Sequence, residues 1–297
     1  MRKCGIIDMG SNTIRLSVYH VEDGNAQLLL GKKVMAGLAS YVKKGTLTQP
    51  GIQMACATLE SYQSLLKNLD IDEYYAFATA SLRNIDNTEE AVAEIKKRTG
   101  ICVDLISGED EGRLSLKGAL NCTNCNDGLL MDLGGGSTEI VPFKNRTATS
   151  LYSLHAGSLT LYKKCVENIF PTKLERHAIQ DYYGELISEI YIPNTDIICG
   201  VGGSVRAIAK IMDYTQEREA GSNTFSYEEL ERLYKRLKNS DREAVDLMLR
   251  ATPDRLHTII PGMIAVRAVM RAADCQKVVV SRTGVREGYL YSRVLNR

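Results

Sequence analysis

The chain has 297 residues, enough for two domains of roughly 150 residues each. Hydrophobic residues make up 44% of it and charged residues 25%, the composition of an ordinary globular protein. The net charge is only +1, so no global field draws polyanions, and no apolar run approaches the roughly 18 residues of a membrane span. We therefore expect no membrane and no nucleic acid among its partners.

The first half of the chain is expected to form three strands and then alternating helices and strands. Asp23-Gly24 provides a hairpin turn between the second and third strands. Thr48 and Asn87 are predicted helix caps, and Gly100 lies just beyond the second helix. The strands are expected at 3–9, 13–21, 26–36, 74–79 and 101–106, and the helices at 48–69, 87–98 and about 110–120.

The second half repeats this order and adds helices. Ser226-x-x-Glu229 and Ser240-x-x-Glu243 match capping boxes, which predicts that two inserted helices begin there. The polar stretch 121–127 is short and marks the expected boundary between two domains, 1–124 and 125–297. The strands are expected at 128–133, 137–143, 147–154, 196–200 and 277–281, and the other helices at 158–167, 173–190, after 203, at 261–272 and from about 285.

Three glycine-rich turns follow apolar strands. In the first, Asp132 is followed by Gly134, Gly135, Gly136, Ser137 and Thr138. In the second, Asp8 is followed by Gly10, Ser11, Asn12 and Thr13, and in the third a strand leads into Gly202, Gly203 and Ser204. Such turns present backbone N–H groups with no side chains in the way, which is how proteins bind phosphate. One such turn alone would indicate only a tight turn, but three after apolar strands favour phosphate binding.

Carboxylates stand beside two of these turns. A carboxylate cannot bind phosphate directly, because both are negative, but it can hold a cation or a water next to it. Asp8, Asp132 and Glu139 are therefore candidate magnesium ligands, directly or through water. The alternatives are that both aspartates hydrogen-bond the glycine turns and that Glu139 is an ordinary strand residue.

The chain resembles the exopolyphosphatase / guanosine pentaphosphate phosphatase (Ppx/GppA) family, within the superfamily of actin, Hsp70 and the sugar kinases. DLGGGST occurs across the superfamily, whereas SGEDEGRL after TASLRN is typical of this family. The matching segments are IDMGSNTIRL (7–16), ATASLRNIDN (78–87), ISGEDEGRL (106–114), MDLGGGSTEIV (131–141), HAGSLTL (155–161), GVGGSVRAIA (200–209), RLHTIIPGM (255–263) and GVREGYLY (284–291).

The resemblance implies an α/β fold of two ribonuclease H-like domains flanking a cleft. It also implies a Mg²⁺-dependent hydrolase that removes terminal phosphate from inorganic polyphosphate or from guanosine pentaphosphate, and a possible homodimer. Glu111 matches the family's proposed general base, although this chain has Asp110 for Glu and Gly112 for Ala in that motif. Arg83 and Arg255 match arginines of the family and are suited to phosphate, because their planar fork makes bidentate bonds.

Other interpretations remain open at this point. From spacing alone, Glu111 is an acid at a helix N-terminus and Arg83 an arginine in a surface salt bridge. An ATP-dependent kinase of the same superfamily would need a catalytic Asp early in the second domain, and none is found between Thr149 and Ser158. A non-catalytic nucleotide sensor is a third possibility.

Cysteine use and the start of the chain both favour an intracellular protein. There are eight cysteines, and Cys122 and Cys125 form one C-x-x-C pair with no second pair to complete a zinc site. We expect reduced thiols. Residues 1–3 lead directly into the first strand, so no signal peptide is expected and we predict a cytoplasmic protein.

Overall fold

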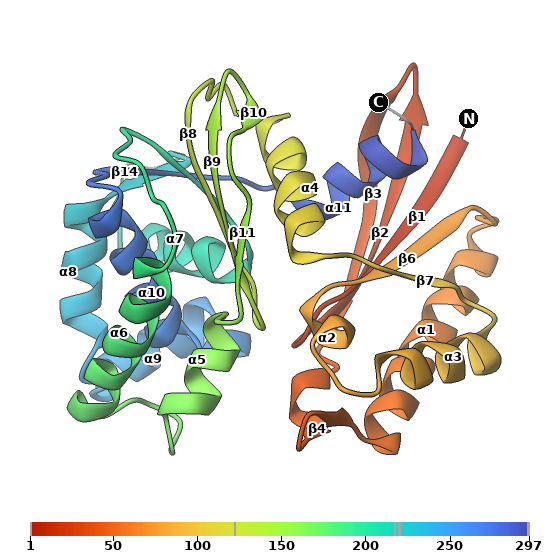
Figure 1. Ribbon diagram of the computed structural model, residues 1–297, viewed down its shortest axis with the longest axis horizontal. Helices are drawn as coiled ribbons and strands as arrows, with labels where there is room; N and C mark the ends of the chain where they lie inside the picture. The colour runs from red at the N-terminus through yellow and green to blue at the C-terminus, as the bar shows by residue number, and fades with distance from the viewer. Residues whose placement is uncertain (1, 122, 217, 219–220, 296–297) are drawn as a thin grey trace. The chain divides into compact units, whose positions relative to one another are not determined.

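The computed structural model describes residues 2–121, 123–216, 218 and 221–295 (Figure 1). By contacts the chain divides into two compact units. Unit 1 is Met1–Glu111 with Leu290–Arg297, and unit 2 is Gly112–Tyr289. The expected domains, 1–124 and 125–297, are defined by the repeat in the sequence. The two units are defined by which residues pack together, so the expected boundaries remain a prediction.

Unit 1 is a five-stranded sheet in the order β3-β2-β1-β6-β7, in which β6 and β7 run parallel to β1. Asp23 and Gly24 have φ values of 47° and 70°, as the predicted hairpin turn requires. Its elements are β1 (Arg2–Met9), β2 (Ile14–Glu22), β3 (Asn25–Val34), η1 (Leu38–Tyr41), β4 (Val42–Lys43), β5 (Thr46–Leu47), α1 (Gln49–Asn68), β6 (Tyr74–Ala78), α2 (Ala80–Arg83), α3 (Thr88–Thr99), β7 (Val103–Leu105) and the start of α4 (Gly108–Leu120).

Unit 2 is a seven-stranded sheet in the order β10-β9-β8-β12-β14-β13, with β11 paired to β9. Its elements are the rest of α4, β8 (Gly128–Leu133), β9 (Thr138–Lys144), β10 (Thr147–Ala148), β11 (Tyr152–Leu154), α5 (Ser158–Cys165), α6 (Lys173–Ser188), β12 (Ile198–Val201), α7 (Gly203–Thr215), β13 (Thr224–Ser226), α8 (Tyr227–Leu237), α9 (Arg242–Ala251), η2 (Pro253–Arg255), α10 (Ile259–Ala272), β14 (Lys277–Val280) and α11 (Val285–Tyr289). A π-helical turn, η3 (Leu290–Val294), follows and belongs to unit 1.

Strand β8 is buried along its whole length because the sheet is covered on both faces. Leu129 and Met131 pack into a core with residues of α7 and α10. Leu130 faces the opposite side and packs against Leu116 and Leu120 of α4. The buried central strand therefore delivers Asp132 and the turn after it from a fixed position.

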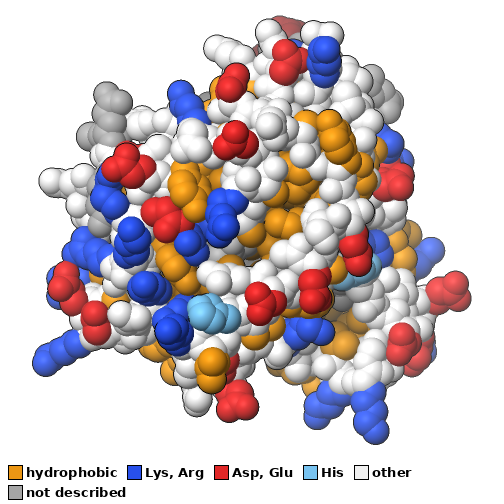
Figure 2. Space-filling model, turned by 60° about the vertical axis from the view of Figure 1, so that its left-hand side comes forward, with side chains coloured by type: hydrophobic (Ala, Val, Ile, Leu, Met, Phe, Trp, Pro, Cys, Tyr) orange, Lys and Arg blue, Asp and Glu red, His pale blue; other side chains and the backbone are white. Residues whose placement is uncertain are grey.

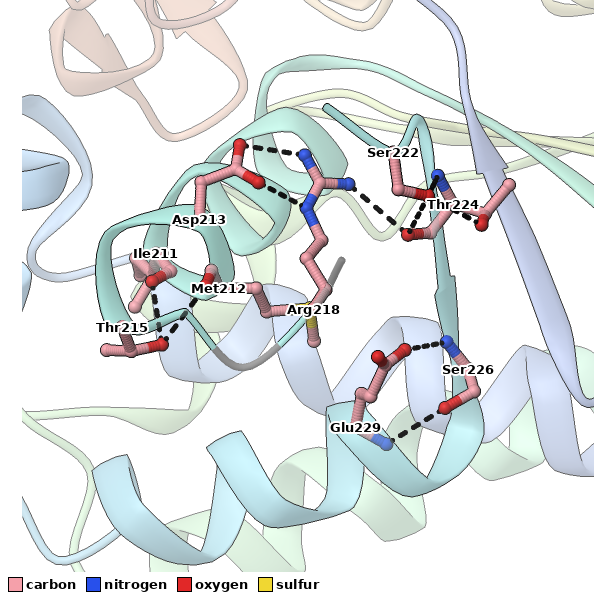
Figure 3. A network of polar contacts seen from close by, with 9 residues as sticks. All are labelled: Ile211, Met212, Asp213, Thr215, Arg218, Ser222, Thr224, Ser226 and Glu229. Carbon is pink, nitrogen blue, oxygen red and sulfur yellow. Dashed lines mark hydrogen bonds and ion pairs between the residues drawn. The ribbon is translucent and has the colours of Figure 1, made fainter. Parts of the chain in front are cut away.

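Two predicted helix starts have different outcomes. Ser226 and Glu229 form the expected capping box: the Ser226 N–H donates to Glu229 Oε2 at 2.6 Å, and the Glu229 N–H donates to Ser226 Oγ at 3.1 Å (Figure 3). The prediction at Ser240 is wrong, because the cap of α9 is Asp241, whose Oδ1 accepts the N–H of Ala244 at 2.9 Å. A carboxylate one residue later satisfies the same orphan amides.

Short irregular elements account for the other differences from the predicted pattern. The strand expected at 147–154 is divided into β10 and β11. The pattern did not indicate the edge strand β13, which starts where the Arg218 guanidinium links Asp213 to the carbonyl of Thr224 (Figure 3). Within the described ranges, no helix is both long and apolar enough to cross a membrane.

Candidate active site

The two predicted Asp-x-Gly turns have the same backbone construction. In unit 1, the Gly10 N–H donates to the Thr13 carbonyl at 3.0 Å, and in unit 2 the Gly134 N–H donates to the Ser137 carbonyl at 3.1 Å. In each case the glycine lies two residues after the aspartate and the bond closes a tight turn between two antiparallel strands. The sequence repeat is therefore also a structural repeat.

In unit 1 the predicted residues gather at the carboxyl ends of the parallel strands. The turn after β1 is fixed through its carbonyl groups, since Ser11 O accepts from the Ala39 N–H and Asn12 O accepts from the Gly37 N–H, both at 2.9 Å. Its peptide planes are therefore held from one side by the segment after β3. Asp8, at the end of β1, is half-buried.

Arg83 and Glu111 form an ion pair in unit 1. Arg83 ends α2, which follows β6, and its Nη1 donates to Glu111 Oε2 at 2.8 Å and to the Ile106 carbonyl at 2.8 Å. The two side chains are only 17% and 10% exposed. Arg83 is therefore in a salt bridge, as its isolated position in the sequence allowed. Its partner is the predicted base, and the pair is largely shielded from water rather than exposed at the surface.

In unit 2 the turn after β8 is held by two helix starts. The first turn of α5 lies on it: Ser158 N–H donates to Gly134 O at 3.0 Å, and the N–H groups of Leu159 and Thr160 donate to Gly135 O at 3.0 and 3.1 Å. A Cβ at Gly157 would lie 2.4 Å from the Gly135 carbonyl carbon, so only glycine permits this approach. These hydrogen bonds are accepted by the carbonyl groups of Gly134 and Gly135, so they leave the amides of Gly135 and Gly136 available to an anion.

Two amides of this turn, those of Gly135 and Gly136, have no acceptor among the described residues. Below them, Ser204 Oγ of α7 donates to Ser158 Oγ at 2.9 Å, and Ser158 Oγ donates to Gly134 O at 3.2 Å. The buried serines therefore connect the third glycine turn to the first one.

Arg255 lies against the third turn. A Cβ at Gly203 would come within 1.9 Å of Arg255 Nη2 and 2.5 Å of its Cζ, so the guanidinium packs directly on the Gly203 backbone. A Cβ at Gly202, where φ is 96°, would lie 2.3 Å from the Leu133 carbonyl oxygen. The strand pair β8 and β12 thus brings Gly202, Gly203, Ser204 and Arg255 to the predicted phosphate turn.

Two carboxylates face each other beside this turn. Asp132 and Glu139 are directly opposite in the antiparallel pair β8 and β9, so they share one face of the sheet, and both are buried. Asp132 Oδ2 accepts from Ser115 Oγ of α4 at 2.5 Å, and Glu139 Oε1 accepts from Ser153 Oγ at 2.9 Å.

The electrostatic surroundings of Asp132 are mixed. Burial raises the pKa of the Asp132 carboxyl above its ordinary value, whereas the Ser115 hydroxyl and the charges of Arg206 and Arg286 act in the opposite direction. Two carboxylates held on one buried face suit a divalent cation, which removes their repulsion and takes its remaining ligands from substrate and water. Within the described part of the chain, no group of three or more His, Cys, Asp or Glu side chains is placed to bind a metal.

Several supporting residues were not singled out in the sequence. Ser115 and Ser158 are hydroxyl residues inside helical segments, and only the fold shows that they contact Asp132 and Gly134. Arg286, in the matching segment GVREGYLY, lies near enough to influence the pKa of Asp132. The sequence could have indicated Arg286 only through the resemblance of that segment to a family. The roles of the predicted site residues remain predictions.

Positive charge is local, as the small net charge predicts. On the face shown in Figure 2, Lys and Arg side chains gather in one region with Asp and Glu side chains among and around them. A polyanion must therefore be recognised by specific donors and not by a uniformly positive face.

Comparisons with known proteins agree with these features. A model of the Ppx/GppA phosphatase family matches residues 17–297. A guanosine-5'-triphosphate,3'-diphosphate pyrophosphatase of Pseudoalteromonas translucida is 27% identical over 97% of this chain, which spans only 58% of that relative's length. Exopolyphosphatase 1 of Mycobacterium tuberculosis is 22% identical over 98% of this chain and 88% of its own length.

Solved structures share the fold over nearly the whole chain. The Aquifex aeolicus Ppx/GppA family member is 25% identical, covers 100% of this chain and 99% of its own, and has a TM-score of 0.82. An exopolyphosphatase from Cytophaga hutchinsonii is 23% identical with a TM-score of 0.86, covering 98% and 97%. The predicted α/β fold of two ribonuclease H-like, actin-like domains is confirmed. With matched turns, fold and family model in agreement, the chain belongs to the Ppx/GppA phosphatase family.

Proposed function

We propose that the protein is an exopolyphosphatase, which hydrolyses the terminal phosphoanhydride of inorganic polyphosphate and releases orthophosphate. The observation that carries the proposal is the turn at 134–137, in which the amides of Gly135 and Gly136 have no protein acceptor among the described residues and lie beside two buried carboxylates. Backbone donors suit phosphate oxygens, and a carboxylate pair suits the cation that accompanies them.

Each unit has backbone and side-chain donors to which we assign phosphate contacts. Backbone turns give fixed dipoles that need no reorganisation during reaction, and arginines add charge-assisted bonds. The residues to which we assign phosphate contacts are Ser11, Asn12, Thr13, Arg83, Gly134, Gly135, Gly136, Ser137, Thr138, Gly202, Gly203, Ser204 and Arg255.

Magnesium is the cofactor we propose, with Asp132 and Glu139 as its candidate ligands in unit 2 and Asp8 as a candidate ligand or water partner in unit 1. The ion would neutralise charge on the phosphate oxygens when bound. Ser115 and Ser153 each donate a hydrogen bond to one of these carboxylates and so orient them.

Glu111 is the proposed general base. In the first turn of α4 its carboxylate accepts a proton from water as the water oxygen forms a bond to the terminal phosphorus. The bridging phosphorus–oxygen bond breaks, and the electron pair stays on the shortened chain as a phosphate oxyanion. Orthophosphate is the second product, so atoms and charge balance without a further reactant.

Guanosine pentaphosphate is the second candidate substrate, because a pyrophosphatase acting on it is among the relatives. Its hydrolysis at the terminal 5′-phosphate would use the same chemistry and would give the tetraphosphate. The difference lies in what binds beyond the reacting phosphate.

Orthophosphate release tests the proposal. Polyphosphate, guanosine pentaphosphate and ATP with sugar acceptors are compared with magnesium and with chelator, in water enriched in ¹⁸O. We expect release from polyphosphate at the highest kcat/KM, only with magnesium, and with label in the released orthophosphate. Transfer of phosphate to a sugar would indicate a kinase, and no release from either phosphate substrate would contradict the proposal.

Location and assembly are separate proposals. The seven cysteines that the structure describes are all free thiols, which fits a reducing cytoplasmic location. Cys122 lies outside the described residues, so the predicted C-x-x-C pair is not tested. A homodimer is a further proposal, supported only by family resemblance, and sedimentation of the intact chain would test it.

A further inference from the structure

The ion pair between Arg83 and Glu111 lies inside the proposed site and involves two residues with separate assigned roles. Arg83 Nη1 is 2.8 Å from Glu111 Oε2, and both side chains are largely shielded from water. In such surroundings a charge pair is much stronger than the exposed pairs of this chain, such as Arg232 with Glu228. The position of the Glu111 carboxylate therefore depends on Arg83.

The fold explains why these two residues meet. They are 28 positions apart, but β6 and β7 are adjacent parallel strands, so the segments that leave them begin at one edge of the sheet. Arg83 Nη1 also donates to the carbonyl of Ile106, and the Glu111 N–H donates to the Ser107 carbonyl at 2.8 Å. One guanidinium thus links the end of α2, the end of β7 and the first turn of α4.

The ion pair also constrains the orientation of the base, because Arg83 Nη1 holds Glu111 Oε2 at 2.8 Å. A glutamate without such a partner samples several rotamers, and reaction requires the carboxylate in one of them. Removal of the pair is therefore expected to lower the rate through loss of alignment.

We propose that Arg83 is a positioning residue that acts on the reaction through Glu111, and not an independent phosphate ligand. This inference rests on the proposed function and changes the role assigned to Arg83. It predicts that Arg83 affects kcat and leaves the affinity for polyphosphate nearly unchanged. An independent phosphate ligand would do the reverse and raise KM.

A double-mutant cycle on orthophosphate release tests this inference, using Arg83→Gln, Glu111→Gln and the double variant. We expect Arg83→Gln to lower kcat about ten- to a hundredfold, as a misplaced catalytic group does, with KM within about threefold of wild type. The double variant should be no slower than Glu111→Gln alone. If the two effects multiply, or if Arg83→Gln raises KM and leaves kcat unchanged, the inference is wrong.

Two further variants separate positioning from folding. Arg83→Lys keeps a cation that can reach the carboxylate, so it should recover part of the kcat lost in Arg83→Gln, but nothing when Glu111→Gln is also present. Arg98→Gln is the matched control, because Arg98 pairs with Glu94 at 2.6 Å on α3 of the same unit, away from the proposed site. Its kinetics should equal wild type.

The outcomes distinguish this inference from the proposed function. If Glu111→Gln keeps wild-type kcat, the base assignment and the positioning role both fail. If Glu111→Gln is slow but the arginine effect multiplies with it, the proposed function stands and Arg83 returns to the role of an independent phosphate ligand. If Arg83→Gln does not fold, a KM effect in Arg83→Lys without a kcat effect also overturns the inference.

Discussion

The two Asp-x-Gly turns share a backbone but differ in the residue that faces the aspartate. In unit 1, Asp8 of β1 is opposite Arg15 of β2, whereas in unit 2 Asp132 of β8 is opposite Glu139 of β9. A facing arginine offsets the charge of a carboxylate, whereas two facing buried carboxylates repel each other, and the charges of Arg206 and Arg286 also act on Asp132. We therefore propose the unit 2 turn as the stronger candidate for metal binding and Asp8 as the weaker one.

Burial strengthens this difference. Asp132 is 7% exposed and Glu139 1%, whereas Asp8 is half-buried. The turns also differ in side chains, since Gly135 and Gly136 replace the positions of Ser11 and Asn12. Unit 2 therefore offers bare backbone and the proposed cation ligands, and unit 1 offers polar side chains and the proposed base. Variants in the two units should consequently affect different kinetic constants.

The largest expected effect comes from the base in unit 1. Glu111→Gln keeps the size of the side chain but removes its charge, so kcat should fall about 10²- to 10⁴-fold while substrate affinity is held or rises. Steady-state assays with polyphosphate measure the fall in kcat, and equilibrium binding of polyphosphate to the variant measures its affinity. A folded variant with near-normal kcat would refute the role of Glu111.

The next effect compares the two aspartates directly. Asp132→Asn should raise the magnesium concentration for half-maximal activity by at least about a hundredfold, because even loss of an outer partner of a metal costs about 10- to 100-fold. Asp8→Asn should raise it much less, since Arg15 and not a carboxylate faces Asp8. Magnesium titrations of both variants measure this difference. Equal shifts would remove the distinction between the two turns.

Arg255 should affect affinity and not rate. Arg255→Gln removes a charge-assisted pair worth about 1.5–3 kcal/mol, so KM for triphosphate should rise about ten- to more than a hundredfold. Gly203→Ala should give the same direction of change, because the new Cβ would occupy the place of the guanidinium. Arg250→Gln is the control, since Arg250 pairs with Asp246 on the exposed face of α9. A change in kcat alone would place Arg255 elsewhere in the reaction.

The smallest effect concerns pH and stability in unit 2. Burial and the charge of Arg255 lower the pKa of His257, whose ring packs edge-on against Tyr162 at 4.9 Å. The unfolded chain therefore takes up this proton first as pH falls, so His257 should destabilise the fold progressively below its ordinary pKa of about 6.5. Melting temperatures between pH 8 and pH 5 should fall less for His257→Gln than for wild type. His177→Gln, at an exposed position of α6, should behave as wild type.

Local sequence predicted the glycine turns well, because strand patterns and the demand for glycine are properties of neighbouring residues. It did so for Gly134, whose turn closes as its counterpart at Gly10 does. It failed at Ser240, where the φ of 51° is incompatible with an N-cap and Asp241 takes that role. Two adjacent capping residues compete, and the pattern alone cannot decide between them.

Contacts between residues that are distant in the sequence could not be predicted from local patterns. The pairing of Arg83 with Glu111 depends on the order of parallel strands, and the bond from Ser115 to Asp132 depends on how α4 packs on β8. The family resemblance indicated Arg83 as a site residue, but not which atom it would contact. Strand order and helix packing decide such contacts, and neither can be derived from local spacing.

The proposed chemistry is tested by orthophosphate release from polyphosphate by the wild-type chain and by Glu111→Gln, each with magnesium and with chelator. We expect release by wild type only when magnesium is present, and release by Glu111→Gln at least about a hundredfold slower although the variant still binds polyphosphate. Release that persists in chelator, or equal rates for the two proteins, would contradict this chemistry.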